Sequence, residues 1–170
     1  MYKAYFRSER LSFKPLEEKD ICAFRRIADE QHVQQFFQLG DSIDFLDNLN
    51  QYACFPVGVF TFSEKKLIGF INGYVYNAHD KEMLVEFFLT ERYYHDWSYV
   101  TECIRTFVRN NVKIGFRTFR FEVEQEDQYL FNMLVNMPEV RYLEDFIDTA
   151  NTSDSPKSGR YMRVLKISFK

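Results

Sequence analysis

The chain has 170 residues and a mass of 20.5 kDa, which suits a single domain over residues 1–170 whose core needs no metal or disulfide. Hydrophobic residues make up 46% of it and aromatic residues 18%, which excludes disorder over most of the chain. The formal net charge of -3 gives no overall field for a nucleic-acid backbone or an anionic membrane, so neither is an expected partner.

The cellular compartment is predicted from apolar runs and cysteine usage. The first residues hold no apolar run of signal-peptide length, and no stretch approaches the ~18 apolar residues of a membrane span. Cys22, Cys54 and Cys103 are odd in number and far apart, which predicts reduced, mostly buried thiols and no metal site. His32 and His79 stand alone and are expected on the surface. We therefore expect a cytoplasmic protein without a metal.

The N-terminal part of the chain predicts one strand and two helices. Residues 11–15 predict a short strand. A first helix follows, because apolar residues recur at helical spacing, with arginines on the opposite face: Ile21, Phe24, Ile27 and Ala28 against Arg25 and Arg26. A second helix, capped by Asp41 or Ser42, is expected to end before Pro56, and its apolar stripe comprises Leu46, Leu49 and Ala53.

The middle of the chain predicts an antiparallel meander and then a long helix. Three β-rich segments, residues 57–62, 67–76 and 83–89, are separated by polar turns. A central amphipathic helix is expected to close near Gly115. Its apolar stripe comprises Val100, Cys103, Ile104, Phe107 and Val108.

The C-terminal part predicts three strands, a helix and a loop. Residues 117–124 alternate, which predicts a half-buried strand with Phe119, Phe121 and Val123 inward and Arg120, Glu122 and Glu124 outward. The next helix ends at Pro138, and its stripe comprises Leu130, Met133, Leu134 and Met137. Residues 140–147 and 161–169 predict the last two strands, and residues 149–159 a loop.

These elements predict the fold class. A meander that leads to a central helix, followed by a strand, a helix and a final strand pair, is not the order of a doubly wound sheet. We expect an α/β protein of the α+β kind, with a mixed, largely antiparallel central sheet of about seven strands and about four flanking helices.

The element order and several local strings resemble the GNAT superfamily of acyl-CoA-dependent N-acyltransferases. RLSFKPLEEKD is similar to the opening strand and helix start of the branch that acetylates small amines or protein N-termini, such as those of ribosomal proteins. LIGFINGYVY and LVEFFL resemble its third and fourth strands, and YVTECIRTFV resembles the start of its central helix. The resemblance covers nearly the whole chain. It implies acetyl transfer from acetyl-CoA to a small-molecule or peptide amine, by direct attack within a ternary complex.

The resemblance implies a diphosphate-binding loop before the central helix. In the family, glycines there let backbone N–H groups approach the CoA diphosphate at a helix N-terminus. The corresponding residues 94–100 contain none of the six glycines of this chain. Asp96 and Ser98 take the places of the two glycines, Val100 that of a small residue and His95 that of a basic or amide residue, with Trp97 and Tyr99 between them.

The residues of this loop also allow a purely structural interpretation. A carboxylate ~4 Å from a phosphate charge costs about 4 kcal/mol at an effective dielectric of 20. Asp96 and Ser98 can instead cap the helix and satisfy its first N–H groups, while the Ser98 hydroxyl can also donate to a phosphate. His95 has no partners at metal-ligand spacing.

A second family signature follows the fifth strand, where an Asn and a later Ser help to hold the CoA arm. Asp127 and Leu130 are the nearest matches, so both family residues are replaced. Tyr129 lies close to a tyrosine that protonates the leaving thiolate in some members, which makes it a candidate general acid. The alternative is an amphipathic tyrosine at the edge of the core.

The fourth strand of the resemblance carries the other candidate residues. Glu86 matches an acidic position that accepts a proton from the substrate ammonium, for which a buried carboxylate with a raised pKa is suited. A glutamate on the solvent face of the strand is the alternative. Phe87, Phe88 and Leu89 lie where the strand backbone pairs with the pantetheine amides in the family.

Two hypotheses about function follow. The first is a GNAT-type N-acetyltransferase that uses Glu86 as base and Tyr129 as acid, with acetyl-CoA as cofactor. The second is a catalytically silent protein of the same fold that binds another ligand or a protein partner in the same cleft. The many aromatic residues also suggest a homodimer that pairs through residues 161–169.

Overall fold

The computed structural model describes residues 5–36, 55–148 and 160–169. The second helix expected between Asp41 and Pro56, its residues Ser42, Leu46, Leu49 and Ala53, the thiol of Cys54 and the loop 149–159 lie outside the described residues.

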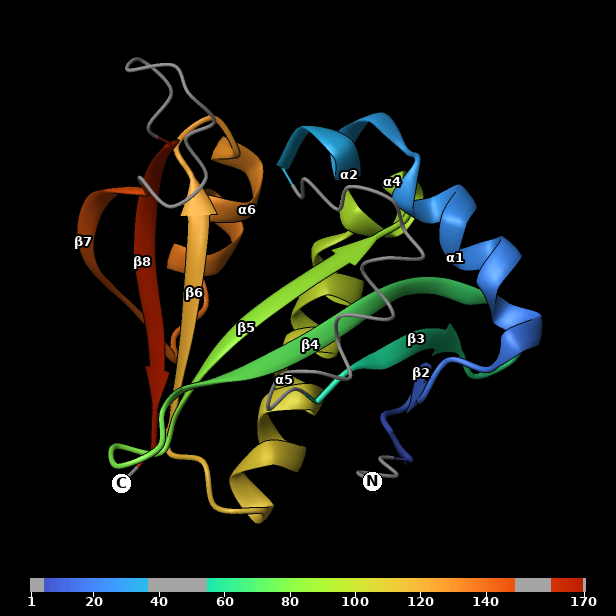
Figure 1. Ribbon diagram of the computed structural model, residues 1–170, viewed down its shortest axis with the longest axis horizontal. Coiled ribbons are helices and arrows are strands. Elements are labelled where there is room, and N and C mark those ends of the chain that lie inside the picture. The colour runs from blue at the N-terminus through green and yellow to red at the C-terminus, as the bar shows by residue number, and fades with distance from the viewer. Residues whose placement is uncertain (1–4, 37–54, 149–159, 170) are drawn as a thin grey trace.

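One mixed sheet forms the centre of the molecule (Figure 1). In the described part of the chain it has 8 strands in the order β1-β2-β3-β4-β5-β6-β8-β7. The strands are β1 (Phe6–Arg7), β2 (Leu11–Lys14), β3 (Val57–Thr61), β4 (Leu67–Asn77), β5 (Glu82–Leu89), β6 (Thr118–Glu124), β7 (Val140–Asp148) and β8 (Arg160–Ser168). Every neighbouring pair is antiparallel except β5 and β6, which are parallel. The α+β class and the largely antiparallel sheet are therefore confirmed.

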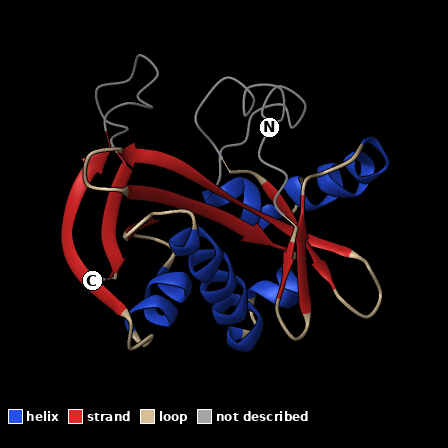
Figure 2. Ribbon diagram, turned by 90° about the horizontal axis from the view of Figure 1, so that it is seen from below, coloured by secondary structure: helices blue, strands red, loops and turns tan. Residues whose placement is uncertain are grey.

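Helices cover both faces of this sheet (Figure 2). They are α1 (Ile21–Ala28), α2 (Gln31–Phe36), α4 (Glu91–Tyr94), α5 (Trp97–Lys113) and α6 (Gln128–Val135), with a 3-10 turn at Glu18–Asp20. The predicted helices around Phe24, Phe107 and Met133 are confirmed as α1, α5 and α6. The short elements β1, α2 and α4 were not expected, because two to six residues are too few to show a period.

Two hydrophobic clusters lie on opposite faces of the sheet. The larger packs α5 and α6 against inward residues of the strands, such as Phe87 and Leu89 of β5. The smaller packs Phe24 of α1 and Val33 of α2 against Phe88 of β5. Alternation along β5 thus directs successive side chains to different cores, which is why the strand is apolar on both faces.

The sheet splits between β5 and β6. Their pairing covers Glu82–Leu84 on β5 and Thr118–Arg120 on β6. Beyond Leu84, β5 pairs with β4, and β6 pairs with β8. Figure 1 shows the two strands moving apart toward α4 and α6, which follow them in the chain. The split therefore lies at the carboxyl ends of the two parallel strands.

Three sequence expectations need correction. Arg120 does not face solvent, since it is 8% exposed, pairs with Glu122 at 2.6 Å and lies over the ring of Tyr76. Cys22 is exposed on α1 rather than buried, whereas Cys103 is buried as expected. β8 lies between β6 and β7, so both of its edges are paired and cannot join a second copy by strand addition. The homodimer itself stays a prediction.

No helix in the described residues is long and apolar enough to cross a membrane.

Candidate functional site

Glu86 lies on β5 just beyond the last residue that pairs with β6. Its side chain is exposed, as the solvent-face interpretation expects. The surrounding protein nevertheless desolvates the carboxyl and raises its pKa above the ordinary value, the negative charge of Glu122 on β6 adds to this, and a hydrogen bond with Tyr74 on β4 opposes it. Glu86 is therefore a carboxylate that solvent can reach and that a nearby positive charge would favour.

Asn72 lies directly across from Glu86 on β4. Its side chain is fully buried, and its Oδ1 accepts a 3.1 Å hydrogen bond from the backbone N–H of Phe55. Among the described residues its Nδ2 has no hydrogen-bond partner. The sequence analysis did not single out Asn72, because a buried asparagine within an apolar strand carries no period or motif of its own.

Asp96 is the N-cap of α5. Its Oδ1 accepts hydrogen bonds from the Ser98 N–H at 2.9 Å and the Ser98 hydroxyl at 2.6 Å. These bonds, above all the one from the Ser98 hydroxyl, lower the pKa of Asp96. The backbone N–H groups of Tyr99 and Val100 donate to the Asp96 carbonyl. The capping interpretation is confirmed for Asp96, whereas Ser98 does not cap the helix but donates its N–H and hydroxyl to Asp96. The amides of Ser98, Tyr99 and Val100 thus already have partners.

A second contact fixes the start of α5 to the turn between β1 and β2. The Nε of Arg10 donates to Oε2 of Glu102 at 2.6 Å, and a terminal nitrogen of the same guanidinium donates to the Ser98 hydroxyl at 3.1 Å. The guanidinium lies 4.1 Å from the centre of the Tyr99 ring. The Ser8 hydroxyl and the Arg10 N–H both donate to Oε1 of Glu102. Sequence reasoning missed this cluster, since its partners are 88 to 94 positions apart.

Tyr94 and Asp127 meet between the elements that follow β5 and β6. The Tyr94 hydroxyl donates a 2.5 Å hydrogen bond to Oδ2 of Asp127, while Oδ1 accepts from the Leu130 N–H and caps α6. Tyr94 is 2% exposed and Asp127 is 3% exposed. Burial raises the pKa of both groups. Asp127 is thus held by the Tyr94 side chain and by the backbone N–H of Leu130.

Aromatic rings surround this contact. The Tyr129 ring lies 5.3 Å from that of Tyr94, 4.9 Å from that of His95 and 6.3 Å from that of Trp97. The Tyr129 hydroxyl is buried and makes no hydrogen bond of ordinary geometry in the described part of the chain. Burial raises its pKa, the charge of Asp96 adds to this, and the nearby Trp97 indole opposes it. Of the predicted site residues, the structure therefore gathers Tyr129, His95 and Trp97 into one cluster.

His32 on α2 contacts both the end of β5 and the Tyr94 ring. Its Nε2 lies 2.8 Å from the carbonyl oxygen of Leu89, to which it must act as donor because a carbonyl only accepts. Its ring lies 5.2 Å from that of Tyr94, and its side chain is 14% exposed. The expectation of a surface residue is wrong for His32, whereas His79 is 96% exposed.

Coenzyme A does not fit these residues in the arrangement that the resemblance implies. The place of its diphosphate, at the N-terminus of α5, holds the Asp96 carboxylate, and the Ser98 amide is already bonded. The place of its pantetheine arm, along β5 beyond the split, has the Leu89 carbonyl bonded to His32. Tyr94 and Asp127, from the elements that follow β5 and β6, bond to each other. The chain's own groups therefore take the interactions that the cofactor needs.

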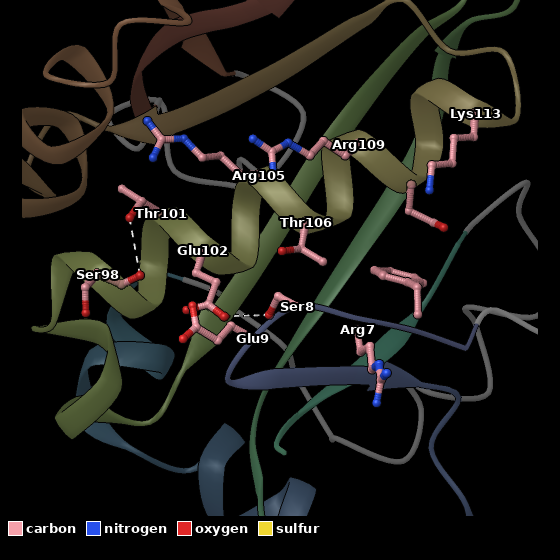
Figure 3. Close-up of a pocket in the computed structure, with 12 residues that line it drawn as sticks. Arg7, Ser8, Glu9, Ser98, Thr101, Glu102, Arg105, Thr106, Arg109 and Lys113 are labelled. Atoms are coloured by element: carbon pink, nitrogen blue, oxygen red, sulfur yellow. Dashed lines mark hydrogen bonds between the residues drawn. The ribbon is translucent and has the colours of Figure 1, made fainter. Parts of the chain in front are cut away.

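A polar groove of about 540 Å³ runs between the β1–β2 turn and one side of α5. Figure 3 shows Ser8 hydrogen-bonded to Glu102 in its lining, whereas Arg7 points away from α5. Arg105 is paired with Glu139 at 2.7 Å. Arg7 lies over the Phe62 ring, so these two lining cations are already engaged by the chain's own groups.

Metal and thiol chemistry find no support at this site. In residues 5–36, 55–148 and 160–169, no three side chains of the metal-binding types come together. Burial raises the pKa of the Cys103 thiol, which keeps it protonated and inert.

The comparisons with known proteins bear on the fold. No protein-family model matches the sequence, and no curated protein is a match. Among solved structures, a GNAT-family acetyltransferase from Bacillus anthracis superimposes with a TM-score of 0.80 at 15% identity, over 97% of this chain and 98% of that one.

Two similar structures contain CoA species. A spermidine N-acetyltransferase from Vibrio cholerae, in complex with CoA and spermine, has a TM-score of 0.76 at 11% identity, over 95% of this chain and 96% of that one. RimJ of Mycobacterium smegmatis, in complex with CoA-disulfide, has a TM-score of 0.75 at 11% identity, over 93% of this chain and 81% of that one. The chain has the fold of the GNAT-family acetyltransferases.

Proposed function

We propose that this chain binds a cationic amine at Glu86 and does not transfer an acyl group from coenzyme A. The observation that carries the proposal is the Glu86 carboxylate, which is exposed at the split of the sheet and whose pKa is raised by its surroundings and by Glu122. A protonated amine at this place would favour the ionised form of Glu86, whereas Glu122 already pairs with Arg120 at 2.6 Å. The fold neighbour that holds spermine is an example of an amine bound by this fold.

Calorimetric titration with spermidine tests the amine site, with a short peptide that has a free N-terminus as a second probe. We expect one-to-one binding that weakens about tenfold or more in Glu86→Gln, since that change removes a charge but little volume. Glu64→Gln is the matched control, because Glu64 is exposed in the turn before β4 and far along the chain from the split. Equal affinities of parent and Glu86→Gln for both probes, or no binding of either probe, would reject the site.

Acetyl transfer is the second candidate function, and two observations favour it. Among the described residues, the backbone of β5 beyond Leu84 has no partner strand on the β6 side, and the Tyr129 hydroxyl has no hydrogen-bond partner of ordinary geometry. In this function Glu86 accepts a proton from the ammonium, which exposes the nitrogen lone pair, and Tyr129 is the candidate acid. Turnover of acetyl-CoA with spermidine, lost in Glu86→Gln and reduced in Tyr129→Phe, would establish this function over the first.

A further inference from the structure

The contact between Tyr94 and Asp127 links the two arms of the split sheet. Tyr94 is the last residue of α4, which follows β5, and Asp127 caps α6, which follows β6. Both side chains are nearly fully buried, and each has a second attachment: Tyr94 packs on the rings of His32 and Tyr129, and Asp127 accepts from the Leu130 N–H. The link is therefore built into the core and is not a loose surface contact.

A linear amide-bearing arm that lies along β5 would have to break this link. It would also compete with His32 for the Leu89 carbonyl, which is the last acceptor of the strand. A buried Asp127 that loses the Tyr94 hydroxyl keeps one bonded oxygen and leaves the other without a donor, which is unfavourable in a dry site. This loss of a hydrogen bond would weaken the binding of any molecule with a pantetheine arm, whatever group is attached to the other end of the arm.

The Asp96 cap acts at a different point and on a different group. It places a carboxylate at the N-terminus of α5, where it opposes a diphosphate but does not touch a neutral arm. The two features therefore oppose different parts of coenzyme A. Pantetheine has the arm but no diphosphate, so its binding depends on the Tyr94–Asp127 contact and not on the Asp96 cap.

We infer that Tyr94 and Asp127 exclude molecules with a pantetheine arm from this chain, because their contact closes the path of the arm between β5 and β6. The inference rests on the proposed loss of coenzyme A binding and assigns its cause. The Tyr94–Asp127 contact is the main obstacle to the arm, and the bond between His32 and the Leu89 carbonyl adds to it.

Titrations of pantetheine and of coenzyme A test the inference. The proteins compared are the parent, Tyr94→Ala, Tyr93→Ala and the double variant Asp96→Gly with Ser98→Gly. Tyr94→Ala removes the ring and the link, and we expect its affinity for both ligands to rise about tenfold or more over the parent. Tyr93→Ala is the matched control, because Tyr93 is the preceding residue of α4 and packs instead on Tyr99, so neither affinity should change. Asp96→Gly with Ser98→Gly should raise the affinity for coenzyme A and leave that for pantetheine unchanged.

Tyr94→Phe serves if Tyr94→Ala does not fold, since it keeps the ring and the core packing and removes only the hydroxyl. We expect its pantetheine affinity to rise at least about threefold. Circular dichroism confirms that each variant is folded. Unchanged pantetheine affinity in folded Tyr94→Phe and Tyr94→Ala, or an equal rise in Tyr93→Ala, would overturn the inference. Spermidine binding is measured separately, so failure of the amine site is distinguishable from failure of this one.

Discussion

Arg10 and Glu102 join the β1–β2 turn to α5 through an ion pair and three hydrogen bonds, one of them from Ser8. Nε and a terminal nitrogen of Arg10 each lie 2.6 Å from Oε2 of Glu102, while the backbone N–H of Arg10 and the Ser8 hydroxyl bond to Oε1. The Glu102 side chain is 16% exposed. This carboxylate therefore fixes the N-terminal half of α5 against the edge of the sheet.

Glu102→Gln is expected to lower the free energy of unfolding by about 2 kcal/mol, because an amide offers one acceptor oxygen where the carboxylate offers two. Urea unfolding at pH 7 measures the change. Glu139→Gln is the control. Its partner Arg105 is also on α5, but both side chains of this pair are 38% exposed, so loss of the pair should cost no more than about 1 kcal/mol. Equal losses in the two variants would contradict a special role for Glu102.

Acid should weaken the same contact. Burial alone raises the pKa of Glu102, but hydrogen bonds from Ser8 and Arg10 and the charge of Arg10 overcome it and lower the pKa below its ordinary value. A folded-state pKa below the unfolded one gives stability that is present above the unfolded pKa and is lost as the pH falls through the folded one. The stability difference between parent and Glu102→Gln should therefore shrink below about pH 4.5, and a constant difference from pH 7 to pH 3 would be inconsistent with the ionised contact.

Removal of the α5 cap should have a smaller effect. Asp96→Ala is expected to lower the free energy of unfolding by about 1 kcal/mol, because the Ser98 N–H loses its acceptor, whereas Asp96→Asn keeps an acceptor and should cost less. Thermal unfolding followed by circular dichroism ranks the variants. An Asp96→Ala protein as stable as the parent would show that the cap contributes nothing.

Glu86 should produce the opposite pH dependence. Its pKa is raised, so the folded state binds more protons than the unfolded state between the ordinary pKa and the raised one, and stability falls as the pH rises through that range. Glu86→Gln should therefore raise the melting temperature at pH 8 and leave it unchanged at pH 4. A melting temperature lowered at pH 8 would mean that the Glu86 charge is stabilised in the fold.

The sequence predicted those elements whose pattern is long and local. β4, β5 and α5 span 8 to 17 residues each, enough for periods of two or of three and four to appear. The Asp96 cap was also predictable, because an N-cap needs only its neighbours in sequence, such as Ser98. The element of four residues, α4, gave no such signal.

The filled cofactor path was not predictable in its details. Tyr94 and Asp127 are 33 positions apart, His32 and Leu89 are 57 apart, and Arg10 and Glu102 are 92 apart. None of these pairs shares a motif, so a single sequence cannot match them. The loss of glycines showed that the diphosphate loop had changed, but only the structure shows the contacts of Tyr94 with Asp127 and of His32 with Leu89.

Titration of acetyl-CoA into the unmodified protein tests the account most directly. With spermidine as the positive control for a folded, active amine site, we predict no saturable heat up to about 1 mM acetyl-CoA, which places any dissociation constant above that value. We also predict no rise in melting temperature at the same concentration, because a ligand stabilises only a folded state that it binds. One-to-one binding of acetyl-CoA with a micromolar dissociation constant would contradict the central claim that the chain's own side chains occupy the cofactor path.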